Sequence, residues 1–512
     1  MDNDRESSEA TETADNGSSQ PQSAPGTAAQ TRIDQRSGEE RRTTPAIFAK
    51  DPSALEEDSD DDDADAGSFT QFIRRTDTAV EDAEESGPGS ILPRQPRTLL
   101  DVGLSKAFLT DLTLKIIHYT GTPSLAQLIR RLGLGPTVVQ QLVTVLGEER
   151  LVEVLSQSDL YTGNYRYRLS ERGTLRVGQA LERSRYAGPA PVTAEQYSEA
   201  MRKLHAYKQE FSRSRIKGLL GELVLSAEVA DAMARALYSG KSALLHGPSG
   251  NGKTSILERF AHELDGIAIV PYAIYAYGQT IRVFDQSIHE PVEDVENLTG
   301  RDETRMDRRW VLVGRPAIFL GAEMGPESLE MPYDPQSRFY QAPPQIKAQG
   351  GVLVIDDFGR QKTEAHELLT RLLIPLERGW ETLALNTGEK LSVPFNVQLL
   401  FGTNRPTQQL ADDSLLRRIL YKVEVSAPQK SEFMEIMRQL CRQRHVLVAE
   451  GVLEHVVELI YGEPRLKPRA SYGRDLLEML IESASFDGRE PVLDRDSFDR
   501  VFRLFMAQES PS

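Results

Sequence analysis

Residues 247–254 read Gly-Pro-Ser-Gly-Asn-Gly-Lys-Thr and fill every fixed position of the pattern G-x-x-x-x-G-K-[ST]. Glycines in such a loop let backbone N–H groups turn around phosphate oxygens, because no Cβ stands in the way. A short apolar run, 243–245, precedes the loop, and apolar residues at helical spacing follow it from Ile256. Strand, glycine loop and helix in this order predict a phosphate-binding site. The residues expected to bind the phosphates are Gly247, Pro248, Ser249, Gly250, Asn251, Gly252, Lys253, Thr254 and Ser255.

Two residues at the end of this loop have separate expected tasks. Lys253 would reach the β- and γ-phosphates of a nucleotide, and the Thr254 hydroxyl would hold Mg²⁺. A second element, Gly-Val-Leu-Val-Ile-Asp-Asp at 351–357, has the consecutive apolar residues typical of a parallel strand buried on both faces. Its carboxylates follow at the C-terminal end, where ligands bind in open α/β sheets. Asp356 is therefore expected to hold Mg²⁺ and Asp357 to orient or deprotonate the attacking water, so that ATP and Mg²⁺ are the predicted cofactors.

Further polar residues follow in the same half of the chain. Asn404 ends another apolar strand, and its amide would hold the water between Asp357 and the γ-phosphate. Arg417 and Arg418 follow a short acidic turn, and Arg474 lies in a helical region. An arginine beside the γ-phosphate would neutralise the charge that spreads over its oxygens in the transition state. The alternative for the first two arginines is plain surface charge, and for the third a salt bridge on a helix surface.

These five elements, in this order, resemble the AAA+ ATPase family over about residues 215–510. The resemblance implies an α/β fold, in which a P-loop NTPase parallel-sheet core at 214–425 is followed by a helical lid at 426–512. In that family Asn404 and the threonine before it would form sensor 1. Either Arg417 or Arg418 would be the arginine finger offered to a neighbouring subunit of a ring oligomer, and Arg474 would be the sensor 2 arginine. The segments at 372–379 and 394–396 look like MoxR-type members, which tend to act as chaperone-like remodelling factors.

Two features depart from the family pattern. The family usually has Glu after the strand aspartate, whereas this chain has Asp357, which is one methylene shorter. Hydrolysis would then be slow, unless the loop compensates. Second, Asp356 lies 103 residues after Lys253, which predicts an insertion at about 272–348. Within it, two apolar runs between 309 and 320 are predicted to form a β-hairpin near a central pore or a subunit face.

The region 98–188 has three apolar-periodic helices followed by two short strand-like runs, a pattern typical of a winged-helix α+β domain. Its third helix has no Lys or Arg between Leu132 and Glu149, whereas reading of a major groove needs such side chains. Arg166 and Arg168 on the second strand keep a wing contact with DNA open. A role in protein interaction or assembly is favoured over DNA binding. Residues 189–213 are predicted to be a helical linker.

Composition separates a tail from this body. The net charge is −17, and residues 1–95 alone hold 23 acidic and nine basic residues. Few apolar residues accompany these charges, so residues 1–97 are predicted to be a disordered acidic tail. The single cysteine, Cys441, excludes an internal disulfide and suits a cytoplasmic location. The longest apolar run, 267–277, is too short to span a bilayer and contains Pro271.

These features predict an ATP-hydrolysing, oligomeric remodelling protein. Its winged-helix domain or acidic tail would recruit an unknown partner protein or regulate assembly. Two alternatives stay open at this point. One is an ATP-gated transcription regulator that binds DNA through the winged helix. The other is a nucleotide-gated scaffold with little hydrolysis, which the shorter Asp357 favours.

Overall fold

The computed structural model describes residues 91–155, 165–206, 223–263, 266–293, 306–411 and 413–508, with the single positions 218, 221 and 295. Most of the predicted tail lies outside these residues. Its predicted end at residue 97 is too late, because Ile91 and Leu92 are 1% and 5% exposed and belong to a buried apolar cluster. The Asp307 N–H also donates to the Pro93 carbonyl at 3.0 Å. The chain is therefore already part of the packed body at Ile91.

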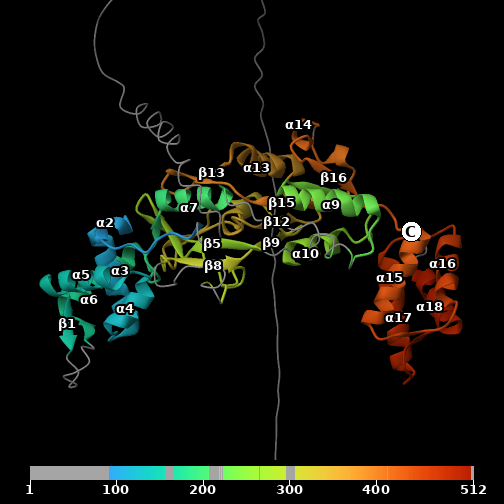
Figure 1. The fold of residues 1–512 in the computed structure, drawn as a ribbon, viewed down its shortest axis with the longest axis horizontal. Coiled ribbons are helices and arrows are strands. Elements are labelled where there is room, and N and C mark those ends of the chain that lie inside the picture. The colour runs from blue at the N-terminus through green and yellow to red at the C-terminus, as the bar shows by residue number, and fades with distance from the viewer. Residues whose placement is uncertain are drawn as a thin grey trace, which may run out of the picture. The chain divides into compact units, whose positions relative to one another are not determined.

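The central sheet has five strands in the order β16-β4-β15-β12-β9, and every neighbouring pair is parallel (Figure 1). The strands are β4 (Ala243–His246), β9 (Ala317–Leu320), β12 (Val352–Ile355), β15 (Gln398–Thr403) and β16 (Tyr421–Glu424). Helices on both faces complete an α/β core of the P-loop NTPase type, as the sequence predicts. The carboxyl ends of these strands lie at one edge of the sheet.

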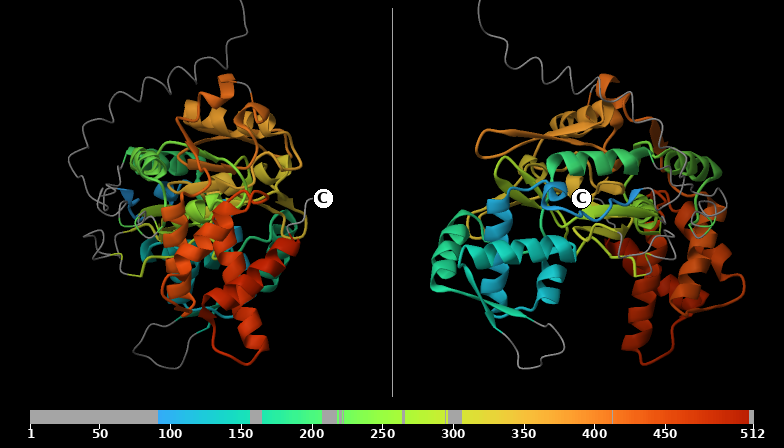
Figure 2. Two further views of the ribbon diagram at one scale, coloured as in Figure 1. Left: turned by 90° about the vertical axis from the view of Figure 1, so that its right-hand side faces the viewer. Right: turned by 60° about the vertical axis from the view of Figure 1, so that its left-hand side comes forward.

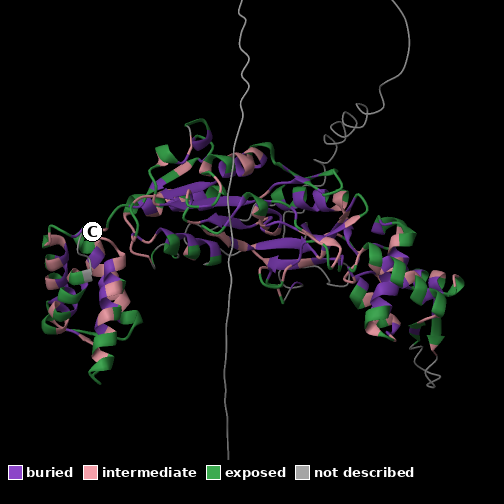
Figure 3. Ribbon diagram, turned by 180° about the vertical axis from the view of Figure 1, so that it is seen from behind, coloured by how far each residue is buried: buried purple, intermediate pink, exposed green. Residues whose placement is uncertain are grey.

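Alternation along the strands divides the core into two apolar layers. In β12, Val352 and Val354 pack with α9 (Ala227–Ser239) and α10 (Lys253–Glu263), whereas Leu353 and Ile355 pack with α13 (Ala365–Arg378). Successive strand residues point to opposite faces, so a run that is apolar throughout needs helices on both sides. Figure 3 shows the inner strands of this sheet buried, in contrast to the exposed outer faces of the surrounding helices, and the inner strands β12 and β15 are buried at every residue.

The lid, defined here as residues 430–508, is a group of four helices (Figure 2). They are α15 (Lys430–Gln443), α16 (Val452–Gly462), α17 (Ser471–Phe486) and α18 (Arg495–Gln508). A small parallel pair, β17 (Leu447–Val448) and β18 (Val492–Leu493), joins two of the connections. One apolar cluster fills the interior of the lid and contains, among others, Phe433, Met437 and Phe498. This separate core explains why the lid folds as a unit.

A second sheet occupies most of the predicted insertion. It has five strands in the order β10-β11-β7-β6-β3. They are β3 (Val192–Thr193), β6 (Ala273–Ala276), β7 (Gln279–Arg282), β10 (Tyr333–Asp334) and β11 (Phe339–Gln341). The short helix α12 (Pro344–Lys347) follows β11, and two antiparallel pairs from residues 267–394 lie outside both five-stranded sheets. These pairs are β5 (Ile267–Pro271) with β8 (Trp310–Gly314), and β13 (Trp380–Ala384) with β14 (Lys390–Pro394).

The predicted hairpin between residues 309 and 320 is wrong. Its first run forms β8 and pairs antiparallel with β5, whereas its second run forms β9 and pairs parallel with β12. The connection between them does not reverse the chain. Arg315 donates to Gln398 Oε1 at 2.8 Å, and the Pro316 carbonyl accepts from the Val352 N–H at 2.9 Å. The insertion therefore includes a strand of the central sheet, and in this edge strand only Ile318 is buried while the other three residues are partly buried.

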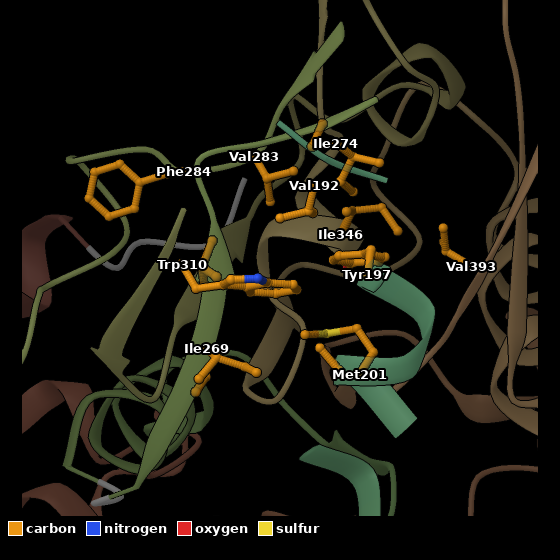
Figure 4. Close-up of a cluster of buried hydrophobic side chains, with 14 of the residues drawn as sticks. Val192, Tyr197, Met201, Ile269, Ile274, Val283, Phe284, Trp310, Ile346 and Val393 are labelled. Atoms are coloured by element: carbon orange, nitrogen blue, oxygen red, sulfur yellow. The ribbon is translucent and has the colours of Figure 1, made fainter. Parts of the chain in front are cut away.

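The predicted helical linker at 189–213 is helical over much of its described part, up to residue 206, but it is not a linker. It supplies β3 to the second sheet and then forms α7 (Ala194–Ala206). Tyr197, Met201 and Leu204 recur on one face of α7 and are at most 3% exposed. The Tyr197 ring stacks on Trp310 of β8 with centroids 6.2 Å apart, in the apolar cluster shown in Figure 4. The amphipathic face of α7 marks it as a core helix.

The elements expected between residues 98 and 188 are present. After the short α2 (Leu99–Val102) come α3 (Lys106–Thr120), α4 (Leu125–Leu132), α5 (Pro136–Glu148), β1 (Val152–Leu155), β2 (Arg166–Leu169) and α6 (Glu171–Arg183). The strands β1 and β2 form an antiparallel pair, and their predicted turn lies outside the described residues. Phe108 packs on Tyr275 of the second sheet, with ring centroids 4.5 Å apart. Among the described helices, none is long and apolar enough to cross a membrane.

Candidate nucleotide-binding site

The predicted phosphate loop connects the end of β4 to the start of α10. Gly247, Gly250 and Gly252 all have positive φ, so the loop has the turned backbone that a phosphate cradle needs. The Lys253 ammonium, whose residue is 8% exposed, donates to the carbonyls of Gly247 and Pro248 at 2.9 and 2.8 Å. Burial lowers the pKa of Lys253, and the carboxylates of Asp356 and Asp357 oppose that shift. These bonds hold the Lys253 ammonium at the centre of the loop.

The two predicted magnesium ligands meet at the edge of the sheet. The Thr254 hydroxyl donates to Asp356 Oδ2 at 2.6 Å, although the residues are 102 positions apart. A hydroxyl and a carboxylate oxygen this close form a hard oxygen donor set of the kind that Mg²⁺ binds beside nucleotide phosphates. These residues therefore fit Mg²⁺. The cation would add positive charge where the β- and γ-phosphates lie.

Asp356 takes its position from a glycine that lies outside the predicted site residues. A Cβ on Gly402 of β15 would overlap Asp356 Oδ1 and crowd Leu257 of α10. The Asp357 N–H also donates to Asp356 Oδ1 at 2.9 Å. A glycine inside a buried apolar strand often marks a place where another group approaches the backbone closely. Gly402 in the sequence was therefore the signal that could have indicated this contact with Asp356.

Asp357 has a left-handed backbone, with φ of +48°. Aspartate tolerates this region better than longer side chains do. Gln361 holds the loop that follows: its Nε2 donates to the carbonyls of Asp356 at 3.0 Å and Asp357 at 3.4 Å, and its Oε1 accepts from the Gly359 N–H at 2.7 Å. The Asp357 carboxylate is exposed beside the magnesium ligands. No feature of the sequence marked Gln361 in advance.

Asn404 lies at the carboxyl end of β15, next to the strand that carries Asp356. It is partly buried. The Thr403 hydroxyl donates to the Phe358 carbonyl at 2.7 Å and accepts from the Arg405 N–H at 3.1 Å. The threonine thus joins the ends of two strands, and Asn404 follows it at the edge where the other site residues gather.

The three predicted arginines have different surroundings. Arg418 forms an ion pair with Glu377 of α13, with Nε and Oε1 2.8 Å apart. Arg417 is exposed, and no ion pair of its guanidinium appears among the described residues. Arg474 is exposed on α17, lies 3.4 Å from Asp475 and lines a shallow hollow within the lid. The structure shows no contact of Arg474 with the described phosphate loop.

The lid residue beside the phosphate loop is Arg469. A Cβ on Gly250 would lie 3.2 Å from Arg469 Cδ, and the guanidinium lies over the Tyr472 ring at 5.8 Å. The N–H groups of Ala470 and Ser471 reach the same loop. Among the predicted phosphate-binding residues, Ser249 and Ser255 are exposed, and Asn251 is buried.

The comparisons with known proteins add little to this picture. A family model described as a domain of unknown function (DUF8689) matches residues 429–504, which is the lid. No curated protein matches the chain. Among solved structures, a point mutant of RuvB from Thermotoga maritima has 15% identity and a TM-score of 0.30, covering 57% of this chain and 70% of that one. NtrX from Brucella abortus has 12% identity and a TM-score of 0.33, covering 60% and 68%. An ADP complex of the same NtrX has 14% identity and a TM-score of 0.32, covering 64% and 65%.

Superpositions at these TM-scores carry no argument about this chain. Its class follows from its own features: an all-parallel five-stranded sheet, a complete phosphate loop after β4, and a carboxylate after β12 that contacts the loop threonine. Together these define a P-loop NTPase core, which a group of four helices follows.

Proposed function

We propose that this protein hydrolyses ATP as an oligomeric AAA+ ATPase that remodels a partner protein. The observation that carries the proposal is the direct bond between Thr254 and Asp356, next to Asp357 and the buried Lys253. This arrangement joins a phosphate cradle, a magnesium ligand pair and a second carboxylate at one edge of the sheet. Phosphoryl transfer to water needs these groups, because its catalysis is mainly positioning and charge stabilisation.

Each residue has a defined task in this proposal. Loop N–H groups and the Lys253 ammonium bind the phosphates and stabilise the charge that develops on them. Thr254 and Asp356 hold the cation. Asp357 orients a water molecule or accepts its proton, and Asn404 helps to place that water. Water adds to the γ-phosphorus as the bond to ADP breaks, and phosphate leaves.

The arginine finger is assigned to Arg417 in this proposal. Arg418 is already bound to Glu377 of its own chain, whereas Arg417 is exposed and reachable by a neighbouring subunit. On the lid, Arg469 replaces Arg474 as the arginine that reaches the nucleotide, because it alone of the two contacts the phosphate loop. The MoxR-like resemblance supports a chaperone-like remodelling role in the cytoplasm. The region 98–188 or the acidic tail would recruit the partner.

Phosphate release from the full chain with Mg²⁺-ATP, measured over a series of protein concentrations, tests the proposal. Turnover per chain is expected to rise with concentration. Lys253→Ala should lower it at least about a thousandfold. Arg417→Ala should also be inactive, and mixing it with Lys253→Ala should restore part of the activity, because one mixed interface is then intact. Arg418→Ala should lower turnover less than Arg417→Ala does. Turnover that is independent of concentration, without rescue on mixing, would overturn the shared site.

A second candidate is the nucleotide-gated scaffold, which the short side chain and exposed position of Asp357 support. It predicts ATP binding without multiple turnovers in the same assay. DNA binding by the region 98–188 has less support. The exposed face of α5 carries Thr137, Gln140, Gln141 and Thr144 and no basic residue, and Arg168 on β2 is paired with Glu153 at 2.6 Å. Salt-sensitive binding of duplex DNA by the full chain would revive that alternative.

A further inference from the structure

The first turn of α17 takes two of its hydrogen bonds from the phosphate loop. The Ser471 N–H donates to the Gly250 carbonyl at 2.8 Å, and the Ala470 N–H donates to Asn251 Oδ1 at 3.4 Å. The N-cap of α17 is Ala470, so no side chain of the helix itself caps it. The first N–H groups of a helix have no partner within the helix. The phosphate loop therefore supplies acceptors for the N–H groups of the N-cap residue and of the first helical residue.

The contact between loop and lid is close as well as polar. A Cβ on Gly250 would lie 2.8 Å from Ser471 Oγ and 3.2 Å from Arg469 Cδ, and the φ of Gly250 is +83°. Only glycine combines that conformation with that space. We call the contacts of Gly250 and Asn251 with Ala470 and Ser471 the lid latch.

The Asn251 side chain has one atom engaged and one without a partner. Its Oδ1 accepts from the lid, whereas its Nδ2 is buried and has no hydrogen-bond partner in the described part of the chain. The residue as a whole is 7% exposed. A buried amide donor without an acceptor is unfavourable, and a phosphate oxygen is a strong acceptor for it. Asn251 can therefore bind the lid with one atom and a phosphate with the other.

A second tie holds the other end of the lid at the same loop. The Val425 N–H, directly after β16, donates to the His246 carbonyl at 2.8 Å, and a Cβ on Gly247 would overlap the Val425 carbonyl. The lid thus leaves the core beside the first loop glycine and returns to the fourth and fifth loop residues. This second tie directly precedes the lid in the chain, so a moving lid would pivot there and break the latch.

We propose that Asn251 is a positioning residue through which nucleotide binding fixes the lid. A phosphate oxygen that accepts from Nδ2 orients the amide so that Oδ1 faces the Ala470 N–H, which strengthens the latch. By reciprocity, a latched lid raises the affinity of the loop for nucleotide. This role rests on the proposed nucleotide site, but the latch itself is present without any assumption about hydrolysis.

Hydrogen–deuterium exchange on the full chain tests the latch without nucleotide. Asn251→Ala should speed exchange of the Ala470 amide roughly fivefold, the factor that corresponds to one ordinary hydrogen bond. Ser485→Ala, an exposed change near the far end of α17, is the matched control and should leave that amide unchanged. Equal exchange in wild type and Asn251→Ala would overturn the latch, whether or not the protein hydrolyses ATP.

Binding of fluorescent mant-ADP tests the coupling. In wild type, ADP should slow exchange at Ala470 and Ser471, and in Asn251→Ala it should bind roughly fivefold more weakly and leave that exchange unchanged. Asn251→Asp keeps the acceptor for Ala470 but removes the donor, so slow exchange should persist without ADP while mant-ADP affinity falls. Ala470→Pro removes the same bond from the lid side, at a φ of −61° that suits proline. If it leaves mant-ADP affinity unchanged while Asn251→Ala lowers it, Asn251 acts within the loop alone and the coupling is overturned.

If wild-type protein binds no mant-ADP, the proposed function and this coupling both fail, whereas the nucleotide-free exchange result stands by itself. If the protein binds mant-ADP and Asn251→Ala behaves as wild type in both measurements, the proposed function survives and the positioning role is overturned.

Discussion

The two five-stranded sheets of this protein differ in how their strands come together. In the central sheet all neighbours are parallel, and the residues for phosphate and metal binding follow directly after its strands. The second sheet mixes both directions and draws strands from residues 192 to 341. It packs against an apolar cluster that includes Tyr197 and Trp310.

The difference indicates that the central sheet carries the candidate nucleotide site and that the second sheet has a structural role. The edge of a parallel sheet collects the ends of several strands, so polar residues there converge on one ligand. The second sheet instead contacts the region 98–188, and the buried pair Asp307–Arg309, just before β8, also bonds to that region through the Val102 carbonyl. Variants in the central sheet should therefore change nucleotide handling more than stability. Variants in the second sheet and in the region attached to it should do the opposite.

The largest expected effect on stability belongs to Arg309→Ala. The Arg309 side chain is 2% exposed, lies 2.8 Å from Asp307, and donates to the carbonyls of Val102 at 3.0 Å and Pro191 at 3.3 Å. Removing it leaves a buried carboxylate without its cation, which should lower the free energy of unfolding by about 4 kcal/mol. Urea denaturation measures the loss, and mant-ADP affinity should stay unchanged.

Arg308→Ala, an exposed neighbour, is the control for this variant and should cost less than about 0.5 kcal/mol. Equal losses for the two variants would show that the buried pair does not fasten the regions. A large loss of mant-ADP affinity in Arg309→Ala would contradict the expectation that this region affects stability and not nucleotide binding.

Asp357→Asn should lower kcat about a hundredfold, because it removes the carboxylate that orients water or accepts its proton. Asparagine also tolerates the left-handed backbone at this position, so the thermal midpoint should not move. Asp357→Glu supplies the residue common in the family but forces a longer side chain into that backbone at a cost of about 1 kcal/mol. Phosphate-release kinetics of both variants test these expectations. If Asp357→Glu hydrolyses ATP faster than wild type, the left-handed backbone at this position does not require aspartate.

Gly402→Ala should lower the free energy of unfolding by about 2 kcal/mol, because the added Cβ overlaps Asp356 Oδ1 in a packed strand. The displaced carboxylate should also raise the Mg²⁺ concentration needed for nucleotide binding. Gly462→Ala, where a Cβ meets nothing within 4 Å, is the matched control and should be close to neutral. A magnesium titration unchanged from wild type would mean that Gly402 matters for packing alone.

The smallest expected effect concerns pH and the region 98–188. Burial lowers the pKa of Lys115 to about 8, and its ammonium donates to the Ser184 carbonyl at 3.0 Å. Above pH 8 the unfolded chain still binds this proton and the folded chain does not, so stability should rise with pH up to the ordinary lysine pKa. The gain should be about 1 kcal/mol between about pH 8 and about pH 9. Lys115→Met should remove this rise from urea denaturation curves, and identical pH profiles for the two proteins would contradict it.

Much of the site was readable from the sequence because it is local. The phosphate loop, the strand before Asp356 and the helix that follows the loop each depend on consecutive residues whose spacing and turn chemistry suffice to predict them. The same reasoning misread 189–213 as a linker and 309–320 as a hairpin. Local patterns do not say which strand a short apolar run will pair with, since that choice depends on segments elsewhere in the chain.

The sequence by itself determined that this chain carries a P-loop core, and it predicted Thr254 and Asp356 as ligands of the same cation; their direct bond across 102 positions is seen only in the structure. Only the tertiary structure decided that β9 joins the central sheet, that Gly402 makes room for Asp356, and that the lid meets the loop through Arg469 and Ala470. The bond between Asn251 and Ala470 joins residues 219 positions apart. Such contacts follow from packing and from the capping of a helix by a distant loop, and no local spacing encodes them.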